Sequence, residues 1–378
     1  MENFVLYNPT SLHFGRGVCD KLGTTAAGIG RHALLVYGKG SVKASGAYDA
    51  VVSQLRQQNI SFVEYAGIRS NPVVEDVDAA AQLGRQHNVD VIVAVGGGSV
   101  IDSAKMIAIA IPVEHGAWDF VAGKAKPKSA IPLVAVLTLA ATGTEMNRFA
   151  VVQNHDTQQK LGYRSDLMYP RHSFLDPSFT FSVPANYTAY GITDLIAHAL
   201  EAWFGEGDAP LSDKFTGAII REAMEAGPAL LQNLQDYDLR ARIMYAATSA
   251  LNGLTLYGKT SGDWGVHSIG HILSLLYDVP HGASLSIVYP AWMKLLSQRI
   301  PERIALLGKE VFGVDDVEVT IRRFEDFFLS IGSPVRLKPF APQADAQEIV
   351  RLMKDNRAAT YVHKLSEPDY QVLTDLFM

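Results

Sequence analysis

Cysteine is almost absent from this chain. Cys19 is the only one among 378 residues, which excludes intramolecular disulfides and thiolate metal clusters. Any metal must therefore be held by histidine, aspartate or glutamate.

The chain also lacks long apolar runs and a surplus of positive charge. No run approaches the roughly 18 residues of a membrane span, and the start lacks the basic and long apolar segments of a signal peptide. The formal net charge is −6, and Lys and Arg are scattered instead of forming a stripe suited to a phosphate backbone. We therefore expect a cytoplasmic protein that binds neither membrane nor nucleic acid.

Two catalytic signatures are missing. There is no Gly-x-Ser-x-Gly nucleophile elbow, so covalent catalysis is unsupported. The segment from His267 to His271 lacks the glutamate of His-Glu-x-x-His, which weakens metal-dependent hydrolysis as an alternative.

What is present is typical of a globular protein of two domains, given the length and the 48% of hydrophobic residues. In the first half, β-branched runs at 33–37, 61–65, 90–95 and 131–137 alternate with helix-like stretches such as 44–58 and 73–87. This rhythm predicts βαβ units and a Rossmann-like, doubly wound parallel sheet.

Beyond Asp176-Pro177 the strand-like runs stop and helical periodicity takes over, for example at 192–203, 213–231 and 239–256. We predict an α/β dinucleotide-binding domain at 1–180 and an all-helical domain for metal and substrate at 181–378.

A glycine-rich turn follows the apolar run at 91–95. Gly97, Gly98 and Ser99 precede a helix-like segment, and Ser99 with Asp102 matches a capping box. Glycines allow close approach of a ligand, and a helix N-terminus suits a phosphate. The alternative is a turn that merely caps its helix. A second polar turn, from Thr138 to Glu145, follows the next strand, where its hydroxyls and amides could also face the cofactor.

The end of the first predicted strand bears on cofactor choice. An NAD site usually has an acidic residue here, but the sequence has Gly38, Lys39 and Ser41. Gly38 leaves room for a 2′-phosphate, Lys39 offsets its charge and Ser41 can donate a hydrogen bond. We therefore expect NADP(H) to be preferred, with NAD(H) possible; the alternative is that Lys39 is a solvated turn residue.

Four histidines have neighbours that suggest a metal site. Asp194 and His198 are one helical turn apart, and His267, His271 and His281 follow in one short stretch. Such groups are costly to bury among apolar residues unless paired or metal-bound. The donors suit one divalent ion, Fe²⁺ or Zn²⁺; the alternative is a buried Asp-His pair with core histidines.

Together these segments resemble the iron-containing, or group III, alcohol dehydrogenases over almost the whole chain. The likeness also rests on Phe14-Gly15-Arg16-Gly17, Asn71-Pro72, Thr142-Gly143-Thr144-Glu145 and Leu175-Asp176-Pro177. Within the family the chain is most similar to the butanol-dehydrogenase-like aldehyde reductases. The last segment, 366–378, offers little to match.

The resemblance implies a dehydroquinate-synthase-like architecture and a role for each motif. Metal ligation falls to Asp194, His198, His267 and His281, with His271 near the reacting centre and Asn147 near the nicotinamide. The cofactor contacts that it implies are Asn71, Gly97, Gly98, Ser99, Asp102, Thr138, Thr142 and Lys160.

We therefore expect hydride transfer between NAD(P)(H) and a small alcohol or aldehyde. Alternatives are a polyol dehydrogenase, an NAD-using lyase on the same fold, or a non-catalytic nucleotide-binding protein. A synthase-like site needs several basic residues for an acidic substrate, and the helical half offers mainly Lys259 near its histidines. The apolar run Phe4-Val5-Leu6-Tyr7 predicts a homodimer through edge pairing, as the resemblance also implies.

Overall fold

The computed structural model describes residues 1–358 and 361–378, which form two compact units. The N-terminal unit comprises 7–184 and 233–248, and the C-terminal unit comprises 1–6, 185–232 and 249–378. Among the residues described, no helix is both long and apolar enough to cross a membrane.

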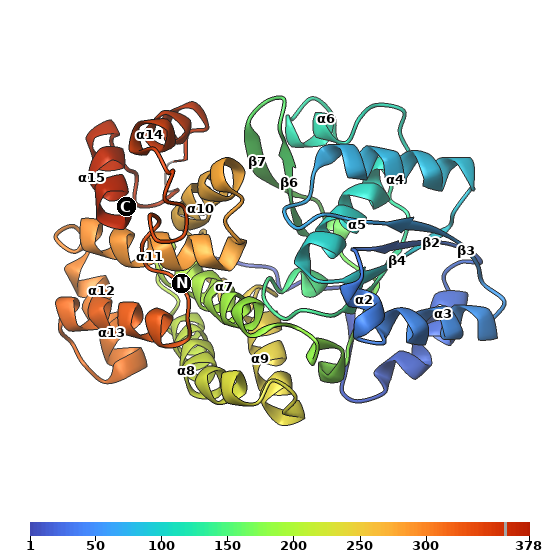
Figure 1. Ribbon diagram of the computed structural model, residues 1–378, viewed down its shortest axis with the longest axis horizontal. Helices are drawn as coiled ribbons and strands as arrows, with labels where there is room; N and C mark the ends of the chain where they lie inside the picture. The colour runs from blue at the N-terminus through green and yellow to red at the C-terminus, as the bar shows by residue number, and fades with distance from the viewer. Residues whose placement is uncertain (359–360) are drawn as a thin grey trace. The chain divides into compact units, whose positions relative to one another are not determined.

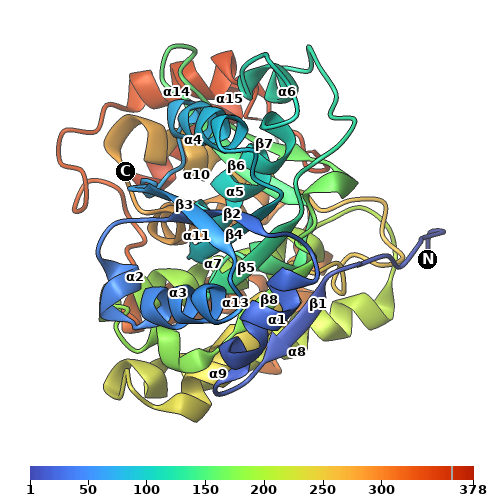
Figure 2. The same ribbon diagram turned by 90° about the vertical axis from the view of Figure 1, so that its right-hand side faces the viewer.

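A six-stranded parallel sheet is the centre of the N-terminal unit. Its order is β1-β8-β5-β4-β2-β3, and Figure 2 shows the strands side by side in this order. The strands are β1 (Ser11–Phe14), β2 (His32–Tyr37), β3 (Ser61–Ala66), β4 (Val91–Gly96), β5 (Leu133–Leu137) and β8 (His172–Leu175). Every residue of β4 and β5 is buried, as expected for a parallel sheet covered on both faces.

Helices cover both faces because successive side chains of a strand point to opposite sides. Leu34 and Val36 of β2 pack in one core with α4 and α5, whereas Ala33 and Leu35 pack in the other with α1 and α3. Figure 1 shows these two helix layers. The helices of this part are α1 (Leu22–Ala27), α2 (Ser41–Ala44), α3 (Ala47–Gln57), α4 (Val74–Gln86), α5 (Gly98–Ala110) and α6 (Trp118–Val121).

A hairpin and one later helix complete this unit. The hairpin is formed by β6 (Phe149–Asn154) and β7 (Gln159–Arg164), and the Asn154 side chain accepts hydrogen bonds from the amides of its turn. Most of α9 (Tyr237–Ala250) belongs here, with Arg16 stacked on the Tyr237 ring. Short 3₁₀ turns lie at Val18–Lys21, Thr144–Met146, Asp166–Met168 and Pro177–Thr180.

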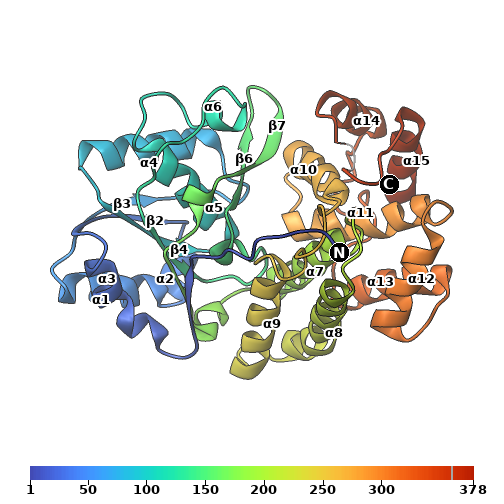
Figure 3. The ribbon, with the colours of Figure 1, turned by 180° about the vertical axis from the view of Figure 1, so that it is seen from behind.

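The regular secondary structure described in the C-terminal unit is helical, apart from an isolated β-bridge between Glu206 and Ser261. Helix α7 packs against both α8 and α11, and α10 packs on α11 (Figures 1 and 3). The helices are α7 (Ala185–Trp203), α8 (Pro210–Gln232), α10 (Gly265–Tyr277), α11 (His281–Leu296), α12 (Pro301–Phe312), α13 (Val317–Ser330), α14 (Ala346–Asp355) and α15 (Glu367–Phe377). The final segment, 366–378, contains α15, which begins with a capping box between Ser366 and Asp369.

The predicted parallel α/β fold with a helical second part is confirmed. The helix expected at 239–256 ends at Ala250, and β1, β8 and the hairpin were not predicted. Phe4 to Tyr7 form no strand in the single chain. Whether the units correspond to domains at 1–180 and 181–378 stays a prediction.

Candidate active site

Helix α7 presents a carboxylate and an imidazole on one face. Asp194 and His198 lie one turn apart, so their side chains leave the same side of the helix. The Nδ1 atom of His198 is 3.6 Å from Oδ1 of Asp194, and the two side chains are 6% and 3% exposed. An ion bound here would be shielded from bulk water.

Two further helices bring imidazoles to the same carboxylate oxygen. Nε2 of His267, on α10, lies 3.7 Å from Oδ1 of Asp194, and Nε2 of His281, the first residue of α11, lies 3.6 Å from it. Potential ligand atoms of Asp194, His267 and His281 all lie within 4.8 Å of one another. The structure therefore brings together all four residues named as ligands by the resemblance. Asp194, His267 and His281 form this group, and His198 lies next to Asp194.

The chemistry of these atoms fits a metal ion. Oδ1 of Asp194, Nδ1 of His198 and Nε2 of His267 are buried without a hydrogen-bond partner within the described chain. Each such atom costs roughly 1–3 kcal/mol when unsatisfied, and an ion would satisfy several at once. Three imidazoles and a carboxylate are donors typical of Fe²⁺ or Zn²⁺.

The protonation of the histidines also matters for metal binding. Burial lowers the pKa of His198 to about 4, although Asp194 opposes this shift. Burial acts in the same direction on His267, but Asp194 and Glu201 outweigh it and raise its pKa to about 9. Near pH 7 His198 is therefore neutral, whereas an ion must displace a proton from His267.

His271 lies on α10 one turn after His267 and is half-buried. Its ring centroid is 5.3 Å from that of His281. Within the described residues, His271 is not part of the group whose potential ligand atoms lie within 4.8 Å of one another. This position beside the ligand set is compatible with a role at the reacting centre, which stays a prediction.

The predicted phosphate turn lies between β4 and α5, as the sequence indicated. The capping box expected at Ser99 is wrong: α5 begins at Gly98, its N-cap is Gly97, and no side chain caps it. A Cβ on Gly98 would come within 2.5 Å of Cγ2 of Thr142, so this glycine allows the turn after β5 to pack against the start of α5. The first amides of α5 have no acceptor inside the helix and suit an anion.

A buried hydrogen-bond network lies behind this turn. The ammonium of Lys105 donates to Oγ1 of Thr144 (2.6 Å), Oδ1 of Asn147 (3.0 Å) and the Phe149 carbonyl (2.7 Å). The Thr144 hydroxyl donates to Oδ1 of Asp102 (2.5 Å). Burial lowers the pKa of Lys105 to about 8. Lys105 therefore fixes the Asn147 amide, a contact that the sequence analysis missed although Lys105 interrupts an apolar helix.

Two other predicted cofactor residues, Asn71 and Lys160, are hydrogen-bonded to each other. The Lys160 ammonium, on β7, donates to Oδ1 of Asn71 at 2.8 Å. Both residues are buried, and Asn71 has a left-handed φ of 58°. Thr138 follows β5 directly, and its amide donates to the Gly96 carbonyl at 3.0 Å.

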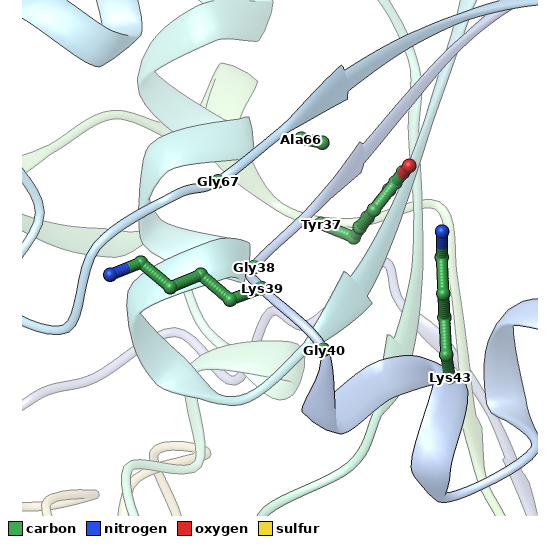
Figure 4. A pocket seen from close by; sticks show the side chains of 7 residues that line it. All are labelled: Tyr37, Gly38, Lys39, Gly40, Lys43, Ala66 and Gly67. Carbon is green, nitrogen blue, oxygen red and sulfur yellow. The ribbon is translucent and has the colours of Figure 1, made fainter.

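A cavity of about 270 Å³ lies at the end of β2 (Figure 4). Its lining includes Gly38 and Lys39, whose side chain leaves the loop in a different direction from that of Lys43. The ammonium of Lys43 lies 5.0 Å from the centre of the Tyr48 ring. Glu64, on β3, accepts hydrogen bonds from the hydroxyls of Tyr37 and Tyr48. The lining is Tyr37, Gly38, Lys39, Gly40, Lys43, Ala66 and Gly67, without a carboxylate; Ser41 begins α2 next to it.

Two residues near the histidines have roles that the spacing did not reveal. Glu201, one turn after His198, accepts a hydrogen bond from Nδ1 of His267 at 2.7 Å. Its place in the apolar run Ala199-Leu200-Glu201-Ala202-Trp203 was an available signal. Lys259 donates to Asp213 at 2.6 Å, and its side chain is 0% exposed. It is therefore not available to an acidic substrate.

Two family models match consecutive parts of the chain. The iron-containing alcohol dehydrogenase model matches residues 9–177, and the C-terminal model of the Fe-containing alcohol dehydrogenase family matches residues 188–363.

Among similar proteins, the probable NADH-dependent butanol dehydrogenase 1 of Bacillus subtilis is 40% identical, with 90% of each chain covered. The NADPH-dependent aldehyde reductase YqhD of Escherichia coli is 36% identical, with 94% of this chain and 92% of that protein covered.

Solved structures show the same relationship. The crystal structure of NADH-dependent butanol dehydrogenase A from Thermotoga maritima superposes with a TM-score of 0.96 at 37% identity, covering 100% of this chain and 99% of that one. With both family models matched and relatives of this similarity along nearly its full length, the chain belongs to the iron-containing alcohol dehydrogenase family.

Proposed function

We propose that the protein is a metal-dependent reductase of small, uncharged aldehydes that also oxidises the corresponding alcohols, with NADP(H) as its preferred cofactor. Family membership makes it an NAD(P)-dependent alcohol dehydrogenase or aldehyde reductase. The observation that carries the proposal is the gathering of three imidazoles around Oδ1 of Asp194 in a buried site.

Asp194, His198, His267 and His281 would hold the ion. A bound divalent ion supplies Lewis acidity toward the substrate oxygen, and a nicotinamide cofactor supplies or accepts the hydride. Aldehyde reduction also consumes a proton. We assign its delivery to His271, because an imidazole can exchange a proton near neutral pH.

The N-terminal unit would bind the cofactor. The amides of Gly97, Gly98 and Ser99 at the start of α5 suit the pyrophosphate. We propose Asn147, held by Lys105, as the neighbour of the nicotinamide. The further contacts proposed are Gly38, Lys39, Ser41, Asn71, Asp102, Thr138, Thr142 and Lys160.

The preference for NADP(H) rests on the cavity at the end of β2. The relatives do not decide it, since one is named for NADH and another for NADPH. The lining contains Lys39 and Lys43 and no acidic side chain, and the Glu64 carboxylate is held by two tyrosine hydroxyls. A 2′-phosphate would therefore meet positive charge and no opposing carboxylate.

The substrate class follows from the charges of the C-terminal unit. Lys259 is bound to Asp213, which disfavours the acidic substrate of a synthase-like lyase. The test is absorbance of NADPH and NADH across short aldehydes, polyols and acidic carbonyl compounds, using protein reconstituted with Fe²⁺ or Zn²⁺. We expect the highest kcat/KM with uncharged aldehydes; turnover restricted to polyols or acids would contradict the proposal.

We also propose a homodimer. Phe4, Val5, Leu6 and Tyr7 are 49%, 84%, 67% and 54% exposed, and such an apolar run can pair with a second chain. A monomeric mass in light scattering at micromolar concentration would contradict it. We propose a cytoplasmic location, where the nicotinamide pool is available, and cell fractionation tests it.

A further inference from the structure

Glu201 connects two of the helices that carry the candidate metal ligands. It lies on α7, and it is 0% exposed. Its carboxylate accepts three hydrogen bonds from the start of α10. Oε2 accepts the Trp264 amide at 2.6 Å, and Oε1 accepts both the His267 amide at 3.0 Å and Nδ1 of His267 at 2.7 Å.

The two backbone contacts fix where α10 begins. Trp264 precedes the helix in a left-handed conformation, with φ of 61°, which costs a non-glycine residue about 1–2 kcal/mol. The His267 amide is one of the first in the helix and has no acceptor within it. A carboxylate at this point satisfies both amides and interacts favourably with the helix dipole.

The side-chain contact fixes the imidazole. Because Nδ1 of His267 donates to Glu201, the lone pair of the metal-binding tautomer lies on Nε2, the atom 3.7 Å from Oδ1 of Asp194. A carboxylate behind an imidazole ligand also increases its donor strength.

We propose that Glu201 is a positioning residue of the metal site, holding His267 with Nδ1 protonated and Nε2 turned toward the ion. The inference rests on the proposed role of His267 as a ligand. It extends the site beyond the four ligands to a residue that does not itself contact the ion.

A second buried carboxylate at the same helix end provides a matched control. Asp263 is 0% exposed and accepts the amides of Gly265 (3.3 Å), Val362 (3.0 Å) and His363 (2.9 Å). All three contacts are with backbone amides, so Asp263 supports the same segment without holding the His267 ring through any of them. Asp263→Asn therefore tests what loss of a buried cap alone does.

The experiment compares wild type, Glu201→Gln and Asp263→Asn. Zn²⁺ affinity is measured by competition with a chromophoric chelator, ligand geometry by the visible absorption of the Co²⁺-loaded protein, and folding by thermal unfolding of the metal-free protein. We expect Glu201→Gln to weaken Zn²⁺ binding by about 10- to 100-fold and to change the Co²⁺ spectrum. Asp263→Asn should lower the melting temperature while affinity stays within about twofold.

Wild-type affinity and spectrum in Glu201→Gln would overturn the inference, as would equal weakening in both variants, which would make Glu201 a structural cap only. If Glu201→Gln does not fold, Glu201→Asp, which keeps the charge but shortens the reach, is judged by the same criteria. A wild-type protein that binds neither Zn²⁺ nor Co²⁺ would overturn the proposed metal function itself. Unchanged binding in Glu201→Gln alone would overturn only this inference.

Discussion

Replacing Lys39 by alanine should reduce the preference for NADPH. Lys39 lines the cavity at the end of β2 and is exposed. NADPH differs from NADH by the 2′-phosphate alone, so a nearby ammonium stabilises one cofactor and not the other. The variant should therefore weaken NADPH use selectively.

The size of the effect follows from the charges. A phosphate monoester carries about −1.5 to −2 charges at pH 7, and two unit charges about 4 Å apart in water attract by about 1 kcal/mol. The aqueous value applies because the Lys39 side chain is exposed. Salt reduces the resulting attraction, and about 1.4 kcal/mol, or tenfold, is expected to remain.

The assay is kcat/KM for NADPH and NADH with one aldehyde, at low and high ionic strength. Lys43→Ala is the matched control: it removes the same charge nearby, but that ammonium lies over the Tyr48 ring. We expect the NADPH to NADH ratio to fall about tenfold in Lys39→Ala and less than about twofold in Lys43→Ala. A ratio unchanged in Lys39→Ala, or a wild-type enzyme that prefers NADH, would refute the reasoning.

Asp194→Ala and His198→Ala should each abolish bound metal and activity while cofactor binding persists, because the ligands and the cofactor loops lie in different units. Elemental analysis measures the bound metal, and NADPH fluorescence titration measures cofactor binding. Full activity without metal would contradict the prediction. His271→Ala should keep near-stoichiometric metal but lose turnover and shift the pH-rate profile, whereas loss of metal would show that His271 is a ligand. Hydrogen bonds from Arg299 hold the pKa of Asp369 down at about 2, below its value of about 3.9 in an unfolded chain. The stabilisation is therefore present above about pH 4 and disappears as pH falls through 2. Since Arg299 is partly exposed, Asp369→Asn should cost about 1–2 kcal/mol in urea unfolding at pH 7 and clearly less at pH 3; an equal cost at both pH values would refute the linkage.

Local patterns of the sequence determined the class of fold. Apolar runs such as 91–95, followed by glycine and a helical period, are read from neighbouring residues alone, and they predicted the parallel sheet correctly. The spacing of Asp194 and His198 likewise required only the helical repeat. The ordered series of motifs identified the family.

Short strands and exact helix starts were not accessible in this way. The strands β1 and β8 have four residues each and pair with each other although most of the N-terminal unit's sequence separates them. Runs this short do not predict a strand by themselves, because each strand depends on its distant partner. Helix α5 begins at Gly98 and not after the predicted cap at Ser99. Thr142, which belongs to a distant turn, lies close to Gly98, a neighbour that the local pattern does not contain.

The convergence of the candidate ligands was decided only by tertiary structure. The spacing placed Asp194 with His198, but whether His267 and His281 face that carboxylate depends on how α11 packs against α7 and how α10 packs on α11. Glu201 meets His267 although they lie 66 positions apart, and Lys259 is neutralised by Asp213, 46 positions away. These partners depend on side-chain packing between helices, whereas the helical period of a sequence specifies only which residues share a face of one helix.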